Sequence, residues 1–269
     1  MTTSRTLTYL LAASLLGACA NPGAKAPQHI AALEHRHVAH FVALEATANL
    51  AGGVNGPNAF LNKDGTINTF TLGAVHPDAI LASKSFHLWQ PTLESVAPVV
   101  WSAEKENLLA QLQQELFDVG TLTGKERQAK KQWRQLMRHV KGTRKQLAEY
   151  QAPMLLFYEE GDFFAQGSSR SNQLLAQIFE VDFIDRHLAL DKKPVNASYL
   201  KLLEPDLVFV LSHGASQHTL PQDTFGADVL GTEPHVVALD TRRWQGAELT
   251  LTQVRELSEM LEAALESGQ

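Results

Sequence analysis

A repeated order of helix, Pro-Asp and apolar strand is the feature that most limits the fold of this chain. One apolar helical segment ends in Pro77-Asp78 and continues into the apolar run 79–82; a second ends in Pro205-Asp206 and continues into 207–211. Proline disfavours helix at the residue before it, so each helix should stop there. A short run that is apolar throughout is typical of a parallel strand covered on both faces. The repeat therefore predicts two similar α/β lobes.

Each predicted strand is followed by a small polar loop and then by a second, proline-led strand. The loops are Ser83-Lys84-Ser85 in the first copy and Ser212-His213-Gly214 in the second. The later strands are expected at 97–101 and 233–239. Loops that follow parallel strands are where open α/β sheets bind ligands, so both loops are candidate binding segments.

The second lobe should begin with a strand at 154–158, followed by a long polar, Gly-rich connection over 159–170. A helix is expected to begin over 174–179. The segment 251–265 has apolar residues on one face and predicts an amphipathic C-terminal helix.

A long helix is predicted between the two lobes, over residues 125–150. Its apolar positions recur at spacings of three and four, and at 1.5 Å per residue it would be about 40 Å long. Most other positions are polar, and many are basic: Lys130, Lys131, Arg134, Arg138, Lys141, Arg144 and Lys145. We interpret this basic side as a solvated helix surface.

The N-terminus has the pattern of a bacterial lipoprotein signal. Arg5 precedes an apolar stretch, 7–16, that is too short to span a bilayer. The stretch runs into Leu16-Gly17-Ala18-Cys19, which resembles a lipobox whose cysteine receives the lipid. Cys19 is the only cysteine, so no disulfide can form within one chain.

These features divide the chain into five parts. They are a signal peptide (1–19), a tether (20–30), an N-terminal α/β lobe (31–124), the linking helix (125–150) and a C-terminal α/β lobe (151–269).

The order of these features resembles the binding proteins of siderophore, haem and cobalamin ABC importers, in which one long helix joins two α/β lobes. The closest resemblance is to the ferric catecholate branch. The resemblance covers nearly all of residues 35–265. It rests on the order along the chain of the two Pro-Asp strands, the segments 43–45, 94–98, 167–170 and 239–240, and Trp244. It implies a monomeric periplasmic protein that holds an iron chelate between its lobes and delivers it to a permease.

By this resemblance, Arg170, Lys84 and His213 fall at cationic positions of the ligand cleft. The family often has arginine where this chain has Lys84 and His213, so the cradle is less positive than in catecholate binders. A less charged chelate therefore remains open. Trp89 and Trp244 are the aromatic residues expected beside the ligand.

Glu45 falls at the family's permease-docking position in the first lobe, whereas 197–199 in the second lobe offers no glutamate. The positions at which some relatives ligate iron directly hold Asp191 and Gln245, so we expect no direct metal ligation and no cofactor. Haem or cobalamin binding on the same fold remains an alternative.

Other functions have weaker support. The eleven histidines suggest a zinc or manganese importer, but their spacings form no set of three or four converging ligands. A net charge of −6 gives no nucleic-acid footprint. Ser212-His213 and the carboxylates over 159–162 are the only enzyme candidates, and no nucleophile elbow or phosphate loop accompanies them. We expect a binding protein and not an enzyme.

Overall fold

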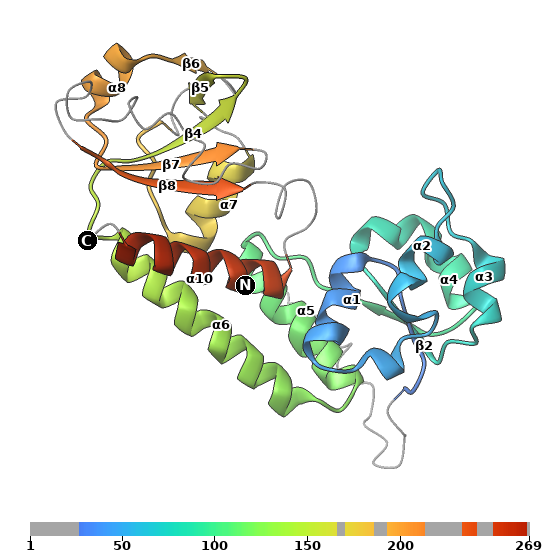
Figure 1. The fold of residues 1–269 in the computed structure, drawn as a ribbon. Helices are drawn as coiled ribbons and strands as arrows, with labels where there is room; N and C mark the ends of the chain where they lie inside the picture. The colour runs from blue at the N-terminus through green and yellow to red at the C-terminus, as the bar shows by residue number, and fades with distance from the viewer. Residues whose placement is uncertain (1–26, 166–169, 186–192, 213–232, 241–249, 268–269) are drawn as a thin grey trace, which may run out of the picture.

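Two α/β lobes lie at opposite ends of a layer of long helices (Figure 1). The computed structural model describes residues 27–165, 170–185, 193–212, 233–240 and 250–267. Within these residues the fold agrees with the predicted class, two α/β lobes with a long helix between them.

The N-terminal lobe is built on a three-stranded parallel sheet in the order β1-β2-β3. Short helices cover it, because each strand is apolar and must be shielded from water on both faces. Its strands are β1 (Ile30–Ala32), β2 (Ala79–Ala82) and β3 (Val99–Trp101). Its helices are α1 (His35–Ala43), α2 (Gly56–Phe60), α3 (Thr69–Ala74) and α4 (Gln90–Glu94), with 3₁₀ turns η1 (Thr47–Asn49), η2 (Gly53–Asn55) and η3 (Lys84–Trp89).

The C-terminal lobe contains a five-stranded sheet in the order β6-β5-β4-β7-β8. Three strands are parallel to one another: β4 (Pro153–Glu159), β7 (Leu207–Ser212) and β8 (His235–Asp240). The other two, β5 (Asp162–Ala165) and β6 (Lys193–Val195), run antiparallel to their neighbours. The helices described in this lobe are α7 (Arg170–Phe179) and α8 (Ala197–Leu203).

The two Pro-Asp repeats have the same structural role. The Asp78 carboxylate accepts hydrogen bonds from the backbone amides of Gln28 and His29, at 2.9 and 3.0 Å, just before β1. The Asp206 carboxylate accepts hydrogen bonds from the amides of Gln151 and Ala152, at 2.6 and 2.9 Å, just before β4. Each aspartate thus ties the start of its own strand to the start of the neighbouring parallel strand.

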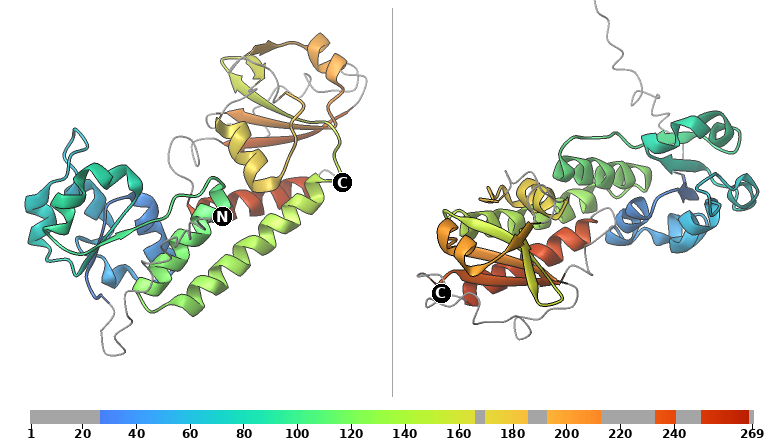
Figure 2. Two further views of the ribbon diagram at one scale, coloured as in Figure 1. Left: turned by 180° about the vertical axis from the view of Figure 1, so that it is seen from behind. Right: turned by 90° about the horizontal axis from the view of Figure 1, so that it is seen from above.

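The layer between the lobes consists of α5 (Leu108–Leu122), α6 (Glu126–Leu147) and α10 (Leu251–Ser267). The helix α6 matches the predicted linking helix, and α5 and α10 lie along it (Figures 1 and 2). Gly124 permits the tight turn between α5 and α6, because its φ of +67° is one that side chains disfavour.

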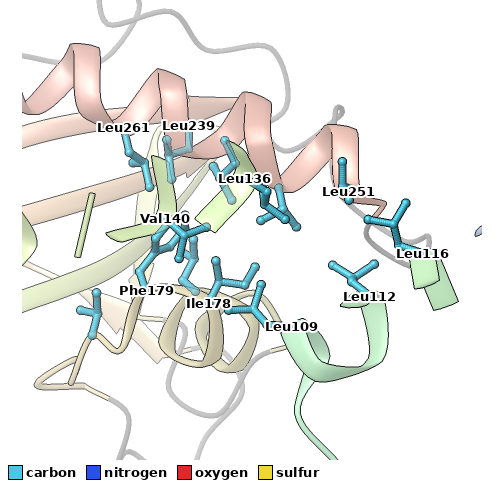
Figure 3. Packing of buried hydrophobic residues seen from close by; sticks show 14 of the residues in the cluster. Leu109, Leu112, Leu116, Leu136, Val140, Ile178, Phe179, Leu239, Leu251 and Leu261 are labelled. Carbon is cyan, nitrogen blue, oxygen red and sulfur yellow. The ribbon is translucent and has the colours of Figure 1, made fainter. Parts of the chain in front are cut away.

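One hydrophobic cluster runs through this layer and into both lobes. Side chains of α5, α6 and α10 interleave with those of α7 and β8, as Figure 3 shows for residues that include Leu112, Val140, Phe179, Leu239 and Leu261. The same cluster reaches the N-terminal sheet through residues of β1 and β2. The lobes are therefore joined by a shared core and not by the linking helix alone.

Most predicted elements are present, with two corrections in the second lobe. The connection 159–170 is not one long loop, because Phe163 to Ala165 belong to β5, which forms a hairpin with β4. Glu160 and Gly161 both have positive φ, 53° and 99°, as a two-residue hairpin turn requires. The helix predicted to begin over 174–179 instead begins at Arg170 and ends at Phe179.

Strand β1 begins at Ile30, and the amides of Gln28 and His29 just before it are already hydrogen-bonded to Asp78.

Among the described residues, no helix is both long and apolar enough to cross a bilayer.

Asp78→Asn should lower the melting temperature at neutral pH. The hydrogen bonds from His29 and Gln28 lower the pKa of Asp78, so its ionised form stabilises the folded state. This contribution is present above the unfolded pKa of about 4 and is lost as pH falls through the lower folded value. As pH falls through that range, the difference in melting temperature between Asp78→Asn and the wild type should become smaller. A difference that is constant with pH, or an equal loss in the exposed Asp162→Asn control, would contradict this role.

Candidate functional site

Polar side chains meet at the carboxyl ends of the three N-terminal strands. Glu34 follows β1, and Ser83 and Ser85 follow β2. The hydroxyl of Ser83 donates to Glu34 Oε1 at 2.8 Å, and that of Ser85 lies 3.4 Å from the same oxygen. The two hydroxyls also hydrogen-bond to each other. Parallel register brings these three residues together, since neighbouring strands end at the same edge.

A buried carboxylate, that of Glu115, contacts residues that follow these strands. Glu115 lies on α5 with 1% of its surface exposed, and its Oε2 is 3.2 Å from His40 Nε2. Gln111 and Ser102 donate hydrogen bonds to Oε1, and Arg36 Nε lies 3.4 Å from it. Arg36 also forms an ion pair with Glu34 at 3.0 Å. The residues after β1 and β3 are thus linked to α1 and α5.

The electrostatics of this network differ between its members. Burial alone would raise the pKa of Glu115, but hydrogen bonds from His40 and Gln111, with the charge of Arg36, lower it to about 2. Burial lowers the pKa of His37 to about 3, although Glu115 opposes the shift. Glu115 is therefore ionised and His37 neutral near pH 7. Among the residues that the structure describes, neither ring nitrogen of His37 has a hydrogen-bond partner, although Glu34 and Glu115 carboxylate oxygens lie 3.5 and 3.8 Å away.

Above the buried network, the rim of the edge carries two opposite charges. Lys84 Nζ lies 3.8 Å from Glu104 Oε2, and the side chains are 64% and 56% exposed. Such an exposed pair contributes at most about 1 kcal/mol, so either partner can be drawn to another charge. The predicted cationic residue is therefore at the strand ends, but its charge is offset by a neighbour that the sequence analysis did not identify.

Aromatic and apolar groups lie beside this rim. Trp101, the last residue of β3, makes an edge-to-face contact with His87 at 4.4 Å between ring centroids. The predicted ligand residue Trp89 is partly buried and packs against the core cluster of the N-terminal lobe. Leu88, beside it in η3, is 93% exposed. Trp101 and Leu88 are thus further candidates for contact with a ligand.

The facing edge of the C-terminal lobe is only partly described. The parallel strands β4, β7 and β8 end at Glu159, Ser212 and Asp240. Their carboxyl ends point toward the N-terminal lobe in Figure 1. The predicted ligand residues His213 and Trp244 lie outside the described residues, as does the side chain of Arg170, the first residue of α7.

The predicted docking residue Glu45 lies in a fixed turn after α1. Its φ is +52°, and its carbonyl oxygen accepts a hydrogen bond from Lys125 Nζ at 2.6 Å. Lys125 also donates to the carbonyl of Leu44 at 2.8 Å. The turn thus holds the exposed Glu45 side chain at the junction of α1 with the helix layer. The predicted lipidation site, Cys19, lies outside the described residues.

Three other places in the fold are candidate sites: a metal centre, the carboxylates over 159–162 and a cavity. Within the described parts of the chain, no three His, Cys, Asp or Glu side chains are arranged to hold a metal ion. The carboxylates over 159–162 belong to the β4–β5 hairpin turn. A cavity of about 270 Å³ lies at the amino end of β4, between the carboxyl ends of α6 and α7. The residues that line it include Arg144, Tyr150 and Phe179.

The buried network was missed by sequence reasoning. The histidines of α1 were noted only as metal candidates, and α5 was not predicted. Its signal was present in Leu109, Leu112, Leu116 and Val119, which recur at helical spacing. Glu115 lies on that same face, and a charged residue there indicates a buried partner.

Comparison with known proteins agrees with this architecture. The family model of periplasmic binding proteins matches residues 58–239. No curated protein sequence matches the chain.

Three solved structures illustrate the similarity of fold. The siderophore-binding protein BauB, solved with two acinetobactin molecules and ferric iron, gives a TM-score of 0.61 at 14% identity, over 90% of this chain and 94% of that one. The petrobactin-binding protein YclQ of Bacillus subtilis gives 0.61 at 15%, over 90% and 93%. The catecholate-siderophore binding protein VctP of Vibrio cholerae gives 0.52 at 15%, over 91% and 95%.

Glu115→Gln should destabilise the protein by about 1.5–3 kcal/mol, because charged hydrogen bonds in a buried network are lost. Urea unfolding at pH 7 measures this. Since the folded pKa is lowered to about 2, the stabilisation by Glu115 should decline as pH falls from about 4.5 toward that value.

Asp118→Asn on the same helix is the matched control. Burial raises the pKa of Asp118, with Gln114 opposing, so its ionised form is disfavoured in the folded state. This variant should be as stable as wild type or more stable at pH 7. Equal losses in both variants would refute the specific role of Glu115.

Proposed function

Since the chain belongs to the periplasmic binding protein family, we propose that it captures a ferric siderophore between its two lobes for an ABC importer. The observation that carries the proposal is the polar edge at the carboxyl ends of β1, β2 and β3. In open α/β sheets this edge is where ligands bind. The family match spans both lobes and includes Ser83, Lys84 and Glu104 of this edge.

The chemistry of this edge suits a chelate rather than a bare ion. The exposed Ser85 hydroxyl and the Lys84 ammonium can donate hydrogen bonds to chelate oxygens, and the Trp101 ring offers an apolar surface. Similar structures that bind acinetobactin with ferric iron, petrobactin and catecholate siderophores support this ligand class. The metal would arrive as part of the ligand and is not a resident cofactor.

The C-terminal lobe would supply Arg170, His213 and Trp244 from the opposite side. Arginine binds anionic oxygens through a fork of donors, whereas histidine is only partly cationic near neutral pH. Because Lys84 is already paired with Glu104, the first lobe adds little net positive charge. The proposed ligand is therefore a ferric siderophore of modest negative charge.

Cys19 and Glu45 would place the protein at a membrane and at its permease. A lipid on Cys19 would hold the protein at a membrane on the periplasmic side, and Glu45 would contact the permease of the importer. We propose that the protein acts as a monomer and carries out binding and release, with no catalysis.

Quenching of tryptophan fluorescence tests the ligand class. The panel is ferric catecholates, ferric hydroxamates, haem, cobalamin and zinc, each chelate with its metal-free partner. We expect a ferric siderophore to quench the fluorescence with a submicromolar dissociation constant, and the iron-free siderophore to bind more weakly. Selective binding of haem, cobalamin or zinc would replace the proposed ligand, and no binding by the folded protein would overturn the proposed function.

Two substitutions at the rim should have opposite effects on the dissociation constant of a ferric siderophore. Lys84→Gln should weaken binding, whereas Glu104→Gln should tighten it by releasing Lys84, each by up to about fivefold because both groups are exposed. Arg170→Ala should weaken binding by about 1–3 kcal/mol. Fluorescence titration measures all three. Unchanged affinity in Arg170→Ala, or shifts of the same sign at Lys84 and Glu104, would contradict these roles.

A further inference from the structure

The outer face of α6 carries a continuous stripe of basic side chains. Its buried residues, which include Ala129, Leu136, Val140 and Leu147, face the other helices. From residue 127 onward, the exposed residues on the opposite side recur at helical spacing and are all Lys or Arg: Arg127, Lys130, Lys131, Arg134, Arg138, Lys141 and Lys145. At 1.5 Å per residue the stripe is about 27 Å long.

In the described part of the chain, these seven cations, hereafter the basic stripe, have no acidic partners. None forms an ion pair with any residue that the structure describes, and Arg134 donates only to the carbonyl of Lys130 within the helix. Arg144, by contrast, turns toward α7, where it binds the carbonyl of Ile178 and pairs with Glu180. The stripe is therefore open to an external anion along its whole length.

The charge of the stripe contrasts with that of the whole chain. The helix α6 has eight basic residues and one acidic residue, a net charge of +7, whereas the whole chain has −6. The remaining residues therefore sum to −13, which is −6 minus +7. A basic face on an otherwise acidic protein gives a preferred orientation toward a negative surface.

We propose that the basic stripe binds the anionic headgroups of a phospholipid surface. Straight and unpaired, it matches an extended array of negative charges better than a compact anionic ligand. Gln28 lies nine positions after Cys19, and nine steps along an extended chain span at most about 32 Å. A chain anchored at Cys19 would thus keep the folded protein close to lipid.

The position of α6 agrees with this orientation. The helix forms the lower border of the molecule in Figure 1, and the first described residues before β1 lie toward the same side. The sheet of the C-terminal lobe lies on the side of the helix layer away from the outer face of α6, and the N-terminal lobe lies at one end of the layer. Resting on lipid through α6 would therefore leave the polar edge free for a ligand.

Vesicle co-sedimentation tests the proposal with the full chain carrying Cys19→Ala, which removes lipidation. We expect binding to phosphatidylglycerol vesicles in excess of that to phosphatidylcholine vesicles. The excess should vanish at about 1 M salt, where the Debye length is about 3 Å. The N-terminal segment carries Arg5 and Lys25, but it is the same in every variant below and so does not account for a difference between them.

A matched pair of variants locates the binding surface. Lys130→Gln, Lys141→Gln and Lys145→Gln together should lower the partition to anionic vesicles by about 100-fold. The same number of charges removed elsewhere, by Lys63→Gln, Lys105→Gln and Lys201→Gln, should lower it far less. Equal losses in the two triple variants, or no excess binding to phosphatidylglycerol, would overturn the proposal. Because no siderophore is used, either result is independent of the ligand.

Discussion

In each lobe, one aspartate carboxylate holds two consecutive backbone amides at the start of the neighbouring parallel strand. Asp78 does this for β1 and Asp206 for β4. Fixing the amino ends also fixes where the carboxyl ends lie, because a strand has a constant rise per residue. The residues that follow the strands, among them Glu34 and Ser83, are therefore brought to one edge. The proposed binding site depends on this register.

The buried network connects that edge to the rest of the molecule. Glu115 belongs to α5, whose apolar face is part of the core shared by both lobes, while its carboxylate contacts residues beside β1 and β3. The edge is thus attached to the helix layer by charged hydrogen bonds. Because the same layer packs against α7 and β8 of the other lobe, the two facing edges are held by one continuous core.

The sequence predicted what depends on periodicity and on strong local signals. The Pro-Asp strands, the long helix α6 and the C-terminal helix follow from apolar patterns and proline. The strand β5 was missed because a Glu160-Gly161 turn resembles a polar loop in sequence. The network of Glu34, His40 and Glu115 was missed for a different reason. Its members are up to 81 residues apart, and only tertiary packing brings them together.

Hydrogen–deuterium exchange with and without a bound ferric siderophore is the most direct test of binding between the lobes. The account predicts slower exchange, on binding, both in peptides containing Ser83 and Ser85 and in peptides containing Ser212 at the end of β7. Protection confined to one lobe, or centred on the cavity beside Tyr150, would contradict it.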